Sequence, residues 1–189
     1  MVYVALLRGI NVGGKNKVEM RRLKATFEEA GMTDVATYIN SGNVVFSDKR
    51  RKAPKITEVL EEAIAQAVGF EIKVLIRDLP AIRKVIKALP EVWTNDKSMR
   101  CDVMFLWEQH DRKGVLQELP IKPDIEDVKY IPGAVLWRID RENVMKSRMS
   151  KVVGTALYKG MTIRNCNTVR KLAVMMEAAD HESRSKVRG

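Results

Sequence analysis

The stretch Val35–Ser47, VATYINSGNVVFS, is the part of the sequence that decides the fold. Two short runs rich in apolar and β-branched residues, Val35–Ile39 and Val44–Ser47, flank the tetrapeptide Asn40-Ser41-Gly42-Asn43. Asparagine, serine and glycine are residues that tight reversals between strands prefer. The stretch therefore predicts a β-hairpin, around which the neighbouring segments can be ordered.

The segments on both sides of this hairpin alternate between strand and helix patterns. Before it, Val2–Arg8 is an apolar run that predicts a buried strand, and residues 19–30 space their apolar side chains as an amphipathic helix does. After it, we expect a helix over 54–68 and an alternating strand over 71–77. The order β-α-β-β-α-β is the split βαβ pattern of the ferredoxin-like fold.

The second half of the chain repeats most of this pattern. A strand is expected at Asp102–Trp107, a short helix at Lys113–Glu118 and a hairpin over 128–139 that Pro132-Gly133 turns. Helices are expected over roughly 144–158 and 168–178, and the last strand of the repeat is uncertain.

The predicted fold class is therefore α+β, with two tandem ferredoxin-like (alpha-beta plait) subdomains packed together. We expect the first subdomain over residues 1–78, the second over 79–180, and a frayed basic tail over 181–189.

Composition narrows the class of protein. The chain has 189 residues, 46% of them hydrophobic, which is enough for a core without disulfides or metal. Its two cysteines, Cys101 and Cys166, form no paired pattern, and its apolar N-terminal run ends at Arg8. These features predict a cytoplasmic protein with no membrane segment, no metal site and no cofactor. Oligomeric state cannot be read from the sequence.

The net charge of +10 is concentrated at the two ends of the chain. Residues 1–52 hold ten lysines and arginines against five acidic residues, and residues 141–189 hold eleven against four. Such a distribution favours an anionic small molecule or a nucleic acid as partner. A basic surface with no dedicated partner explains it equally well.

The loop after the first strand resembles a phosphate-binding loop in part. Gly9–Lys15 reads GINVGGK, but Asn16 follows where a nucleotide triphosphatase needs the serine or threonine that binds magnesium. Parallel strands are also missing from the predicted order. A milder role remains, because glycine-rich turns before a helix expose backbone N–H groups that bind anions.

Topology brings this loop close to the hairpin turn. In a β-α-β-β-α-β unit the end of the first strand and the turn between the second and third strands lie at the same end of the sheet. We therefore expect one anion-binding site there, built by Arg8, Asn11, Gly13, Gly14, Lys15, Asn16, Asn40, Ser41, Gly42 and Asn43.

A late segment adds further candidates. Asn165 or Asn167 can cap the helix expected from Thr168, yet cations crowd its first turn, where acidic residues are favoured. An anion that neutralises them would explain this excess. The candidate ligand-binding residues of this segment are Arg164, Asn165, Asn167, Arg170 and Lys171. Whether they join the Gly9–Lys17 loop in one site is open.

Three separated segments resemble one bacterial family. LLRGINVGGKNKV (Leu6–Val18), YINSGNVVF (Tyr38–Phe46) and TIRNCNTVRKL (Thr162–Leu172) are together similar to the family known as domain of unknown function 1697. The resemblance implies two joined α/β plaits and a set of signature positions, but no reaction. Cys166 departs from the pattern, since the family usually has tryptophan there.

Three functions remain open at this point. The first is a cytosolic binding module for a phosphorylated or other anionic ligand, including a nucleotide or nucleic acid. The second is an enzyme that acts on a small anionic substrate through an Asn/Arg/Lys-rich site, although no catalytic residue can be named. The third is a structural or interaction protein in which the same residues serve only turns and caps.

Overall fold

The protein divides into two compact units. The computed structural model describes residues 1–14 and 16–188. Unit 1 contains Met1–Ile82 and Leu172–Gly189, and unit 2 contains Arg83–Lys171. The sequence predicts subdomains over 1–78 and 79–180 and a tail over 181–189, whereas the units of the structure divide after Ile82 and again after Lys171, where the chain returns to unit 1.

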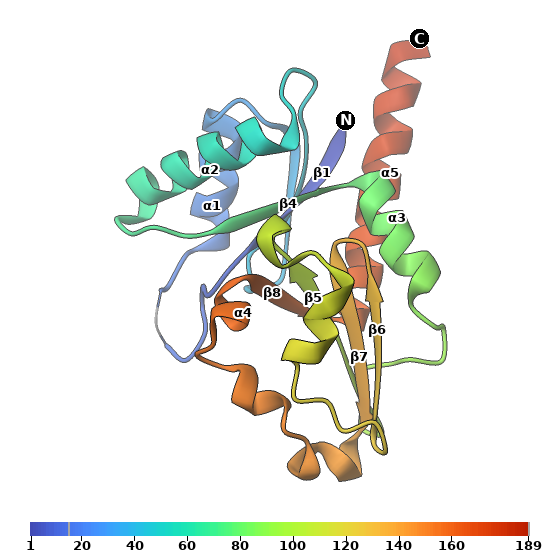
Figure 1. Ribbon diagram of the computed structural model, residues 1–189. Helices are drawn as coiled ribbons and strands as arrows, with labels where there is room; N and C mark the ends of the chain where they lie inside the picture. Colours follow the sequence, from blue (N-terminus) through green and yellow to red (C-terminus); the bar gives the residue numbers. More distant parts are fainter. Residues whose placement is uncertain (15, 189) are drawn as a thin grey trace. The chain divides into compact units, whose positions relative to one another are not determined.

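Unit 1 is built around a four-stranded antiparallel sheet with the strand order β2-β3-β1-β4 (Figure 1). This order is that of the ferredoxin-like fold predicted from the sequence. Its elements are β1 (Val2–Leu7), α1 (Met20–Glu29), β2 (Thr33–Tyr38), β3 (Asn43–Ser47), α2 (Ala53–Val68) and β4 (Val74–Asp78).

The core of unit 1 lies between its sheet and its two helices. Figure 1 shows α1 and α2 side by side, and both contact the strands. Phe27 of α1 is fully buried and meets Phe46 of β3 edge-on, with ring centroids 5.4 Å apart. Leu60 and Ile64 of α2 are also fully buried. These residues occupy the three- and four-residue steps of the helical pattern, which explains why that pattern predicted them correctly.

Unit 2 repeats the same strand order, β6-β7-β5-β8, again fully antiparallel. The last strand, which the sequence left uncertain, is β8. The elements are α3 (Leu79–Ala88, which begins in unit 1), β5 (Met99–Leu106), the 3₁₀ helices η1 (Glu108–His110) and η2 (Lys113–Glu118), β6 (Glu126–Ile131), β7 (Ala134–Asp140), η3 (Arg141–Lys146), η4 (Met149–Val152), α4 (Ala156–Lys159) and β8 (Met161–Asn165).

The helix expected over 144–158 is wrong, because three short pieces occupy that region instead. The hydroxyl of Ser147 accepts a hydrogen bond from the Met149 backbone N–H at 3.0 Å. Serine side chains that bond nearby backbone groups compete with the helical hydrogen bonds. The segment 141–153 therefore forms η3 and η4, separated by a break at Ser147.

The C-terminal helix α5 (Cys166–Arg188) is longer than predicted. It starts two residues before Thr168 and continues through the segment expected to fray. An ion pair between Arg184 and Asp180, 3.0 Å long and one turn apart, stabilises this stretch. None of the helices in the described residues is both long and apolar enough to cross a membrane.

Candidate functional site

The two predicted chain reversals meet at one end of the unit 1 sheet. The Leu7 backbone N–H donates to the Gly42 carbonyl at 2.8 Å, and Leu6 pairs with Asn43 across β1 and β3. The side-chain amide of Asn11 then donates to the Asn40 carbonyl at 2.8 Å. The predicted convergence of the loop and the hairpin turn is confirmed by these contacts.

The asparagines of the loop hold its shape. Asn11 Oδ1 accepts from the Val18 N–H at 2.8 Å, and its Nδ2 donates to the Val18 carbonyl at 2.9 Å. Asn16 Nδ2 donates to the Gly9 carbonyl at 3.1 Å. Both asparagines adopt positive φ angles, 54° and 50°, which asparagine tolerates better than most residues. Their side chains therefore fix the loop.

The hairpin turn uses its signature residues in the same way. Asn43 is fully buried, and its Nδ2 donates to the Tyr38 carbonyl at 3.0 Å and to Ser41 Oγ at 2.9 Å. Gly42 has a φ of +71°, and a Cβ placed there would lie 2.7 Å from Leu7 Cβ. Only glycine fits this position without displacing β1.

An open cleft of about 490 Å³ lies between these two reversals and the start of α1. We call it the rim cleft. Its lining residues are Asn11, Gly14, Lys17, Val18, Glu19, Met20 and Asn40.

Several groups around the rim cleft are open to solvent. Gly13 and Gly14 are exposed and have positive φ angles, and a Cβ on either would have no atom of the described part of the chain within 4 Å. Among residues 1–14 and 16–188 no side chain caps α1 at Glu19, and the first turn of α1 contains no acidic residue. Of the remaining predicted residues, Arg8 is half-buried and donates its backbone N–H to the Lys73 carbonyl at 2.9 Å, while Lys15 lies outside the described residues.

The third segment belongs to unit 2. Arg164 was expected in the first turn of a helix, but it lies in β8, and its side chain is buried. Its Nη1 donates to Thr162 Oγ1 at 3.0 Å and to the Ile163 carbonyl at 2.8 Å. Burial lowers the pKa of Arg164 to about 10. Asn165 Oδ1 accepts from the Thr168 N–H at 2.8 Å, which is the capping bond that the sequence predicted.

The other polar residues of this segment fasten the loop that precedes β5. Arg170 donates to the Trp93 carbonyl at 2.8 Å and to the Pro90 carbonyl at 2.9 Å. Asn167 Nδ2 donates to the Asn95 carbonyl at 2.9 Å. Lys171 is exposed. Arg170, which was expected to face an anion, thus binds backbone oxygens of its own unit.

Cys101 and Cys166 are neighbours, although their spacing in the sequence showed no pattern. Asp102 pairs with Asn165 across β5 and β8, so the two cysteines lie opposite each other one residue further on. Both are fully buried. The Arg170 Nη1 lies 3.6 Å from Cys166 Sγ. The neighbouring Cys101 thiol and this guanidinium lower the pKa of Cys166 below its ordinary value, while the neighbouring Cys166 and burial raise the pKa of Cys101.

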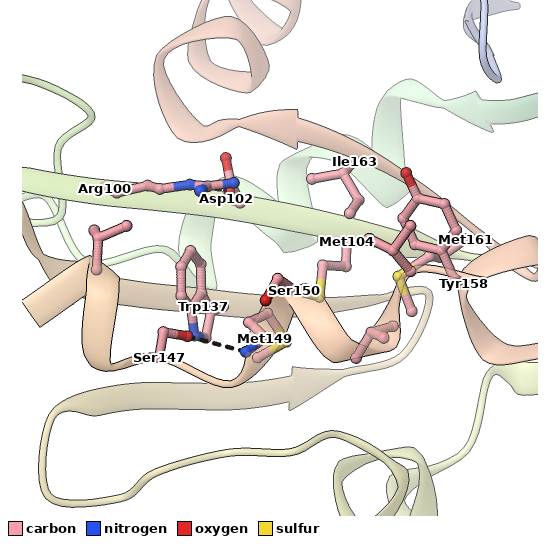
Figure 2. Close-up of a pocket in the computed structure, with 13 residues that line it drawn as sticks. Arg100, Asp102, Met104, Trp137, Ser147, Met149, Ser150, Tyr158, Met161 and Ile163 are labelled. Atoms are coloured by element: carbon pink, nitrogen blue, oxygen red, sulfur yellow. Dashed lines mark hydrogen bonds and ion pairs between the residues drawn. The ribbon is translucent and has the colours of Figure 1, made fainter. Parts of the chain in front are cut away.

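Unit 2 also contains a cavity of about 290 Å³ that the sequence reasoning missed. It lies between the sheet and the segment 141–153, and Figure 2 shows the side chains around it. Its lining comes from β5, β7, β8 and the segment after β7, which are far apart in the sequence. No local pattern marks such a set. Across residues 1–14 and 16–188, no three His, Cys, Asp or Glu side chains gather to hold a metal ion.

Residues 1–137 match the family described as "Protein of unknown function (DUF1697)". The chain belongs to this family. The match includes the first two segments that resemble the family, Leu6–Val18 and Tyr38–Phe46. It ends before the third segment, Thr162–Leu172. The predicted resemblance is thereby confirmed.

A solved structure supports the fold assignment. The chain is similar to the conserved bacterial protein SP0830 from Streptococcus pneumoniae, with 29% sequence identity and a TM-score of 0.78. The similarity covers 93% of this chain and 98% of the other. Among curated proteins no match is found. This DUF1697 protein is therefore an α+β protein of two sheet-and-helix units.

Proposed function

We propose that unit 1 is a binding module for a small anionic ligand, with a phosphate or similar group held in the rim cleft. One observation carries the proposal: the cleft opens directly onto the start of α1, where no side chain of the described residues provides a cap. The first N–H groups of an α-helix have no acceptor within the helix. An anion placed there accepts hydrogen bonds from them and interacts favourably with the helix dipole.

The charges around the cleft fit an anion better than a cation. Lys17, Arg21 and Arg22 are all exposed at or beside the start of α1. Near a helix N-terminus each of these cations is unfavourable by about 0.3–1 kcal/mol unless an anion balances it. Glu19 also lines the cleft and opposes an anion, so it should reduce the affinity.

Hydrogen bonds within the protein connect the two ends of the loop. The three hydrogen bonds of the Asn11 side chain connect the loop to Val18 and to Asn40. These bonds connect positions on either side of Gly13 and Gly14, which are exposed. Ordering a flexible loop reduces affinity, and a loop whose ends are already connected loses less conformational freedom on binding.

RNA binding of the usual ferredoxin-like kind is not supported. That mode needs aromatic side chains exposed on the central strands, where bases stack on them. Tyr3 of β1 and Phe46 of β3 are instead buried and stack on each other at 5.7 Å. A small phosphorylated molecule bound at the rim therefore fits unit 1 better than a single strand of RNA on its sheet.

The test is a titration with inorganic phosphate, pyrophosphate and ADP, followed by the backbone amide resonances of the protein. We expect saturable shifts at Gly13, Gly14 and Arg21, and weaker binding as salt increases, because the contacts are ionic. Shifts spread evenly over the basic surface, without saturation, would refute the proposal.

A charge-reversal pair serves as the matched control. Lys17→Glu should weaken binding at least fivefold, since it places a second carboxylate beside the anion. Lys52→Glu makes the same change in net charge at an exposed position before α2 and should leave binding within twofold. Glu19→Gln should strengthen binding. Equal effects of the two reversals would show that only the overall charge matters.

A further inference from the structure

The cavity of unit 2 is lined by residues of that unit alone. On the sheet side are Met104 of β5, Trp137 of β7 and Ile163 of β8. The opposite side comes mainly from the segment 141–153 and α4. The full lining is Arg100, Asp102, Met104, Trp137, Val144, Ser147, Met149, Ser150, Val152, Val153, Tyr158, Met161 and Ile163.

Most of this lining is apolar. Met104, Met149 and Met161 contribute flexible thioether side chains, which adapt their shape to a ligand. Figure 2 shows Met104, Met161 and Tyr158 grouped toward one end, with Arg100 and Asp102 together toward the other. With a volume of about 290 Å³ the cavity is at the lower end of the range for small-molecule pockets. It suits a small molecule with an apolar body.

The polar end of the cavity presents a guanidinium with unused donors. Arg100 Nε donates to Asp102 Oδ2 at 2.9 Å, and its guanidinium lies 5.3 Å from the centre of the Trp137 ring. Its terminal amino groups make no hydrogen bond within the described residues, and its side chain is 45% exposed. The two terminal amino groups of the guanidinium, with four N–H donors between them, match the two oxygens of a carboxylate.

A second donor nearby also has no acceptor. Trp137 is only 2% exposed, and its indole Nε1 has no hydrogen-bond partner among the described residues. Ser147 Oγ is already engaged, because it donates to Glu126 Oε1 and accepts from the Met149 N–H. A buried donor without an acceptor is unfavourable, so a ligand oxygen that reached the Trp137 indole N–H would be stabilised there.

We propose that unit 2 binds a small, mostly apolar monocarboxylate in this cavity. The carboxylate lies against the terminal amino groups of Arg100, and the apolar body lies among the methionines. Asp102, beside Arg100, leaves little net charge at this end and therefore disfavours a dianion such as phosphate. The site shares no lining residue with the rim cleft and binds a different kind of ligand. Its test is therefore independent of the function proposed for unit 1.

The experiment compares 3-phenylpropionate with its neutral analogue 3-phenylpropionamide. The readout is the indole N–H resonance of Trp137, one of three tryptophans in the chain. We expect a saturable shift of this resonance, with the carboxylate binding about tenfold tighter than the amide because hydrogen bonds to charged groups are stronger. No saturable shift, or equal binding of the two compounds, overturns the proposal.

Variants locate the contact. Arg100→Gln should abolish the preference for the carboxylate. Arg148→Gln should preserve it, because Arg148 is an exposed residue of the segment 141–153 that does not line the cavity. If Arg100→Gln unfolds the protein, Ser150→Phe serves instead, because it fills the cavity from an exposed position and should eliminate binding of both compounds. Unchanged binding in Ser150→Phe, or the same loss in Arg148→Gln, would refute the site.

Discussion

The two units have the same sheet but different coverings. In both, the first strand is central and pairs antiparallel with the third and fourth strands of its unit. In unit 1 the connections are α1 and α2, of ten and sixteen residues. In unit 2 the corresponding connections contain 3₁₀ helices of three to six residues and one four-residue α-helix.

This difference explains where the cavity is. A long amphipathic helix presents a continuous apolar stripe, which fills the space above a sheet. Short 3₁₀ helices present few side chains in any one direction. The sheet of unit 2 is therefore covered less completely, and a cavity of about 290 Å³ remains against it. Strand order determines which strands are neighbours, and the covering segments determine whether space is left for a ligand.

The largest difference in stability between the two units is expected when a large side chain is removed from each. Phe27→Ala in unit 1 should lower the free energy of unfolding by about 3–5 kcal/mol, because a fully packed site cannot close around the space left. Met149→Ala, beside the existing cavity of unit 2, should cost less than about 2 kcal/mol. Urea denaturation measures both. Equal losses would contradict the difference in packing.

Glycine substitutions separate the two reversals of the rim. Gly42→Ala should lower the free energy of unfolding by about 2–4 kcal/mol, since it combines an unfavourable positive φ with a clash against Leu7 and Ile10. Gly14→Ala has a similar φ but open space around it and should cost about 1–2 kcal/mol. Thermal and urea denaturation report the order, and a reversal of it would contradict the packing of the hairpin turn.

Enlarging a small side chain gives the opposite test. Ala5→Leu, in the fully buried centre of β1, should cost about 1–3 kcal/mol by overpacking. Ser150→Leu at the cavity of unit 2 should change stability by less than about 0.5 kcal/mol, because the new side chain enters empty space. Chemical denaturation measures the free energy of unfolding of both variants. A loss at Ser150 as large as that at Ala5 would mean that the cavity is not available.

The smallest expected effect concerns the carboxylates at the end of the third strand in each unit, Asp48 directly after β3 and Asp140 as the last residue of β7. Burial acts to raise the pKa of Asp48, but hydrogen bonds from the N–H groups of Arg50 and Arg51 and the ion pair with Arg51 outweigh it, so the pKa is lowered. A lowered pKa stabilises the folded state above the unfolded value of about 4, and this contribution is lost as the pH falls through the folded value.

Asp48→Asn should therefore cost about 1–2 kcal/mol at pH 7, and the difference from the parent protein should shrink below about pH 4. The counterpart in unit 2 is Asp140, whose side chain is 49% exposed. Asp140→Asn should change stability by less than about 0.5 kcal/mol at either pH. Urea denaturation at pH 7 and pH 3 checks both, and a pH-independent loss at Asp48 would contradict the assigned role.

Much of unit 1 could be predicted from the sequence, because its signals are local. The NSGN turn, the stripe of α1 and the alternation of β4 each lie within a few residues. The convergence of Asn11 with Asn40 followed from topology. The roles of these asparagines could not be predicted, because an asparagine that binds a ligand and one that stabilises a loop look the same in a sequence.

Unit 2 was predicted less well, because the contacts that shape it join segments far apart in the sequence. Ser147 interrupts the helix expected over 144–158 through a bond with Met149. Arg170 donates hydrogen bonds to the carbonyls of Pro90 and Trp93, which lie about eighty positions earlier in the sequence. Such contacts depend on which segments lie together after folding, and no pattern of spacing indicates them.

The sequence by itself determined the α+β class, the order of strands and helices in unit 1, and the excess of cations near the start of α1, since these follow from periodicity, turn chemistry and charge. Only the tertiary structure decided which polar groups are engaged and which remain open. In the structure Asn43, Arg164 and Arg170 donate to protein acceptors, whereas donors of Arg100 and Trp137 have no acceptor among the described residues. The physical reason is that hydrogen bonding and burial depend on the distances between side chains, which local sequence does not specify.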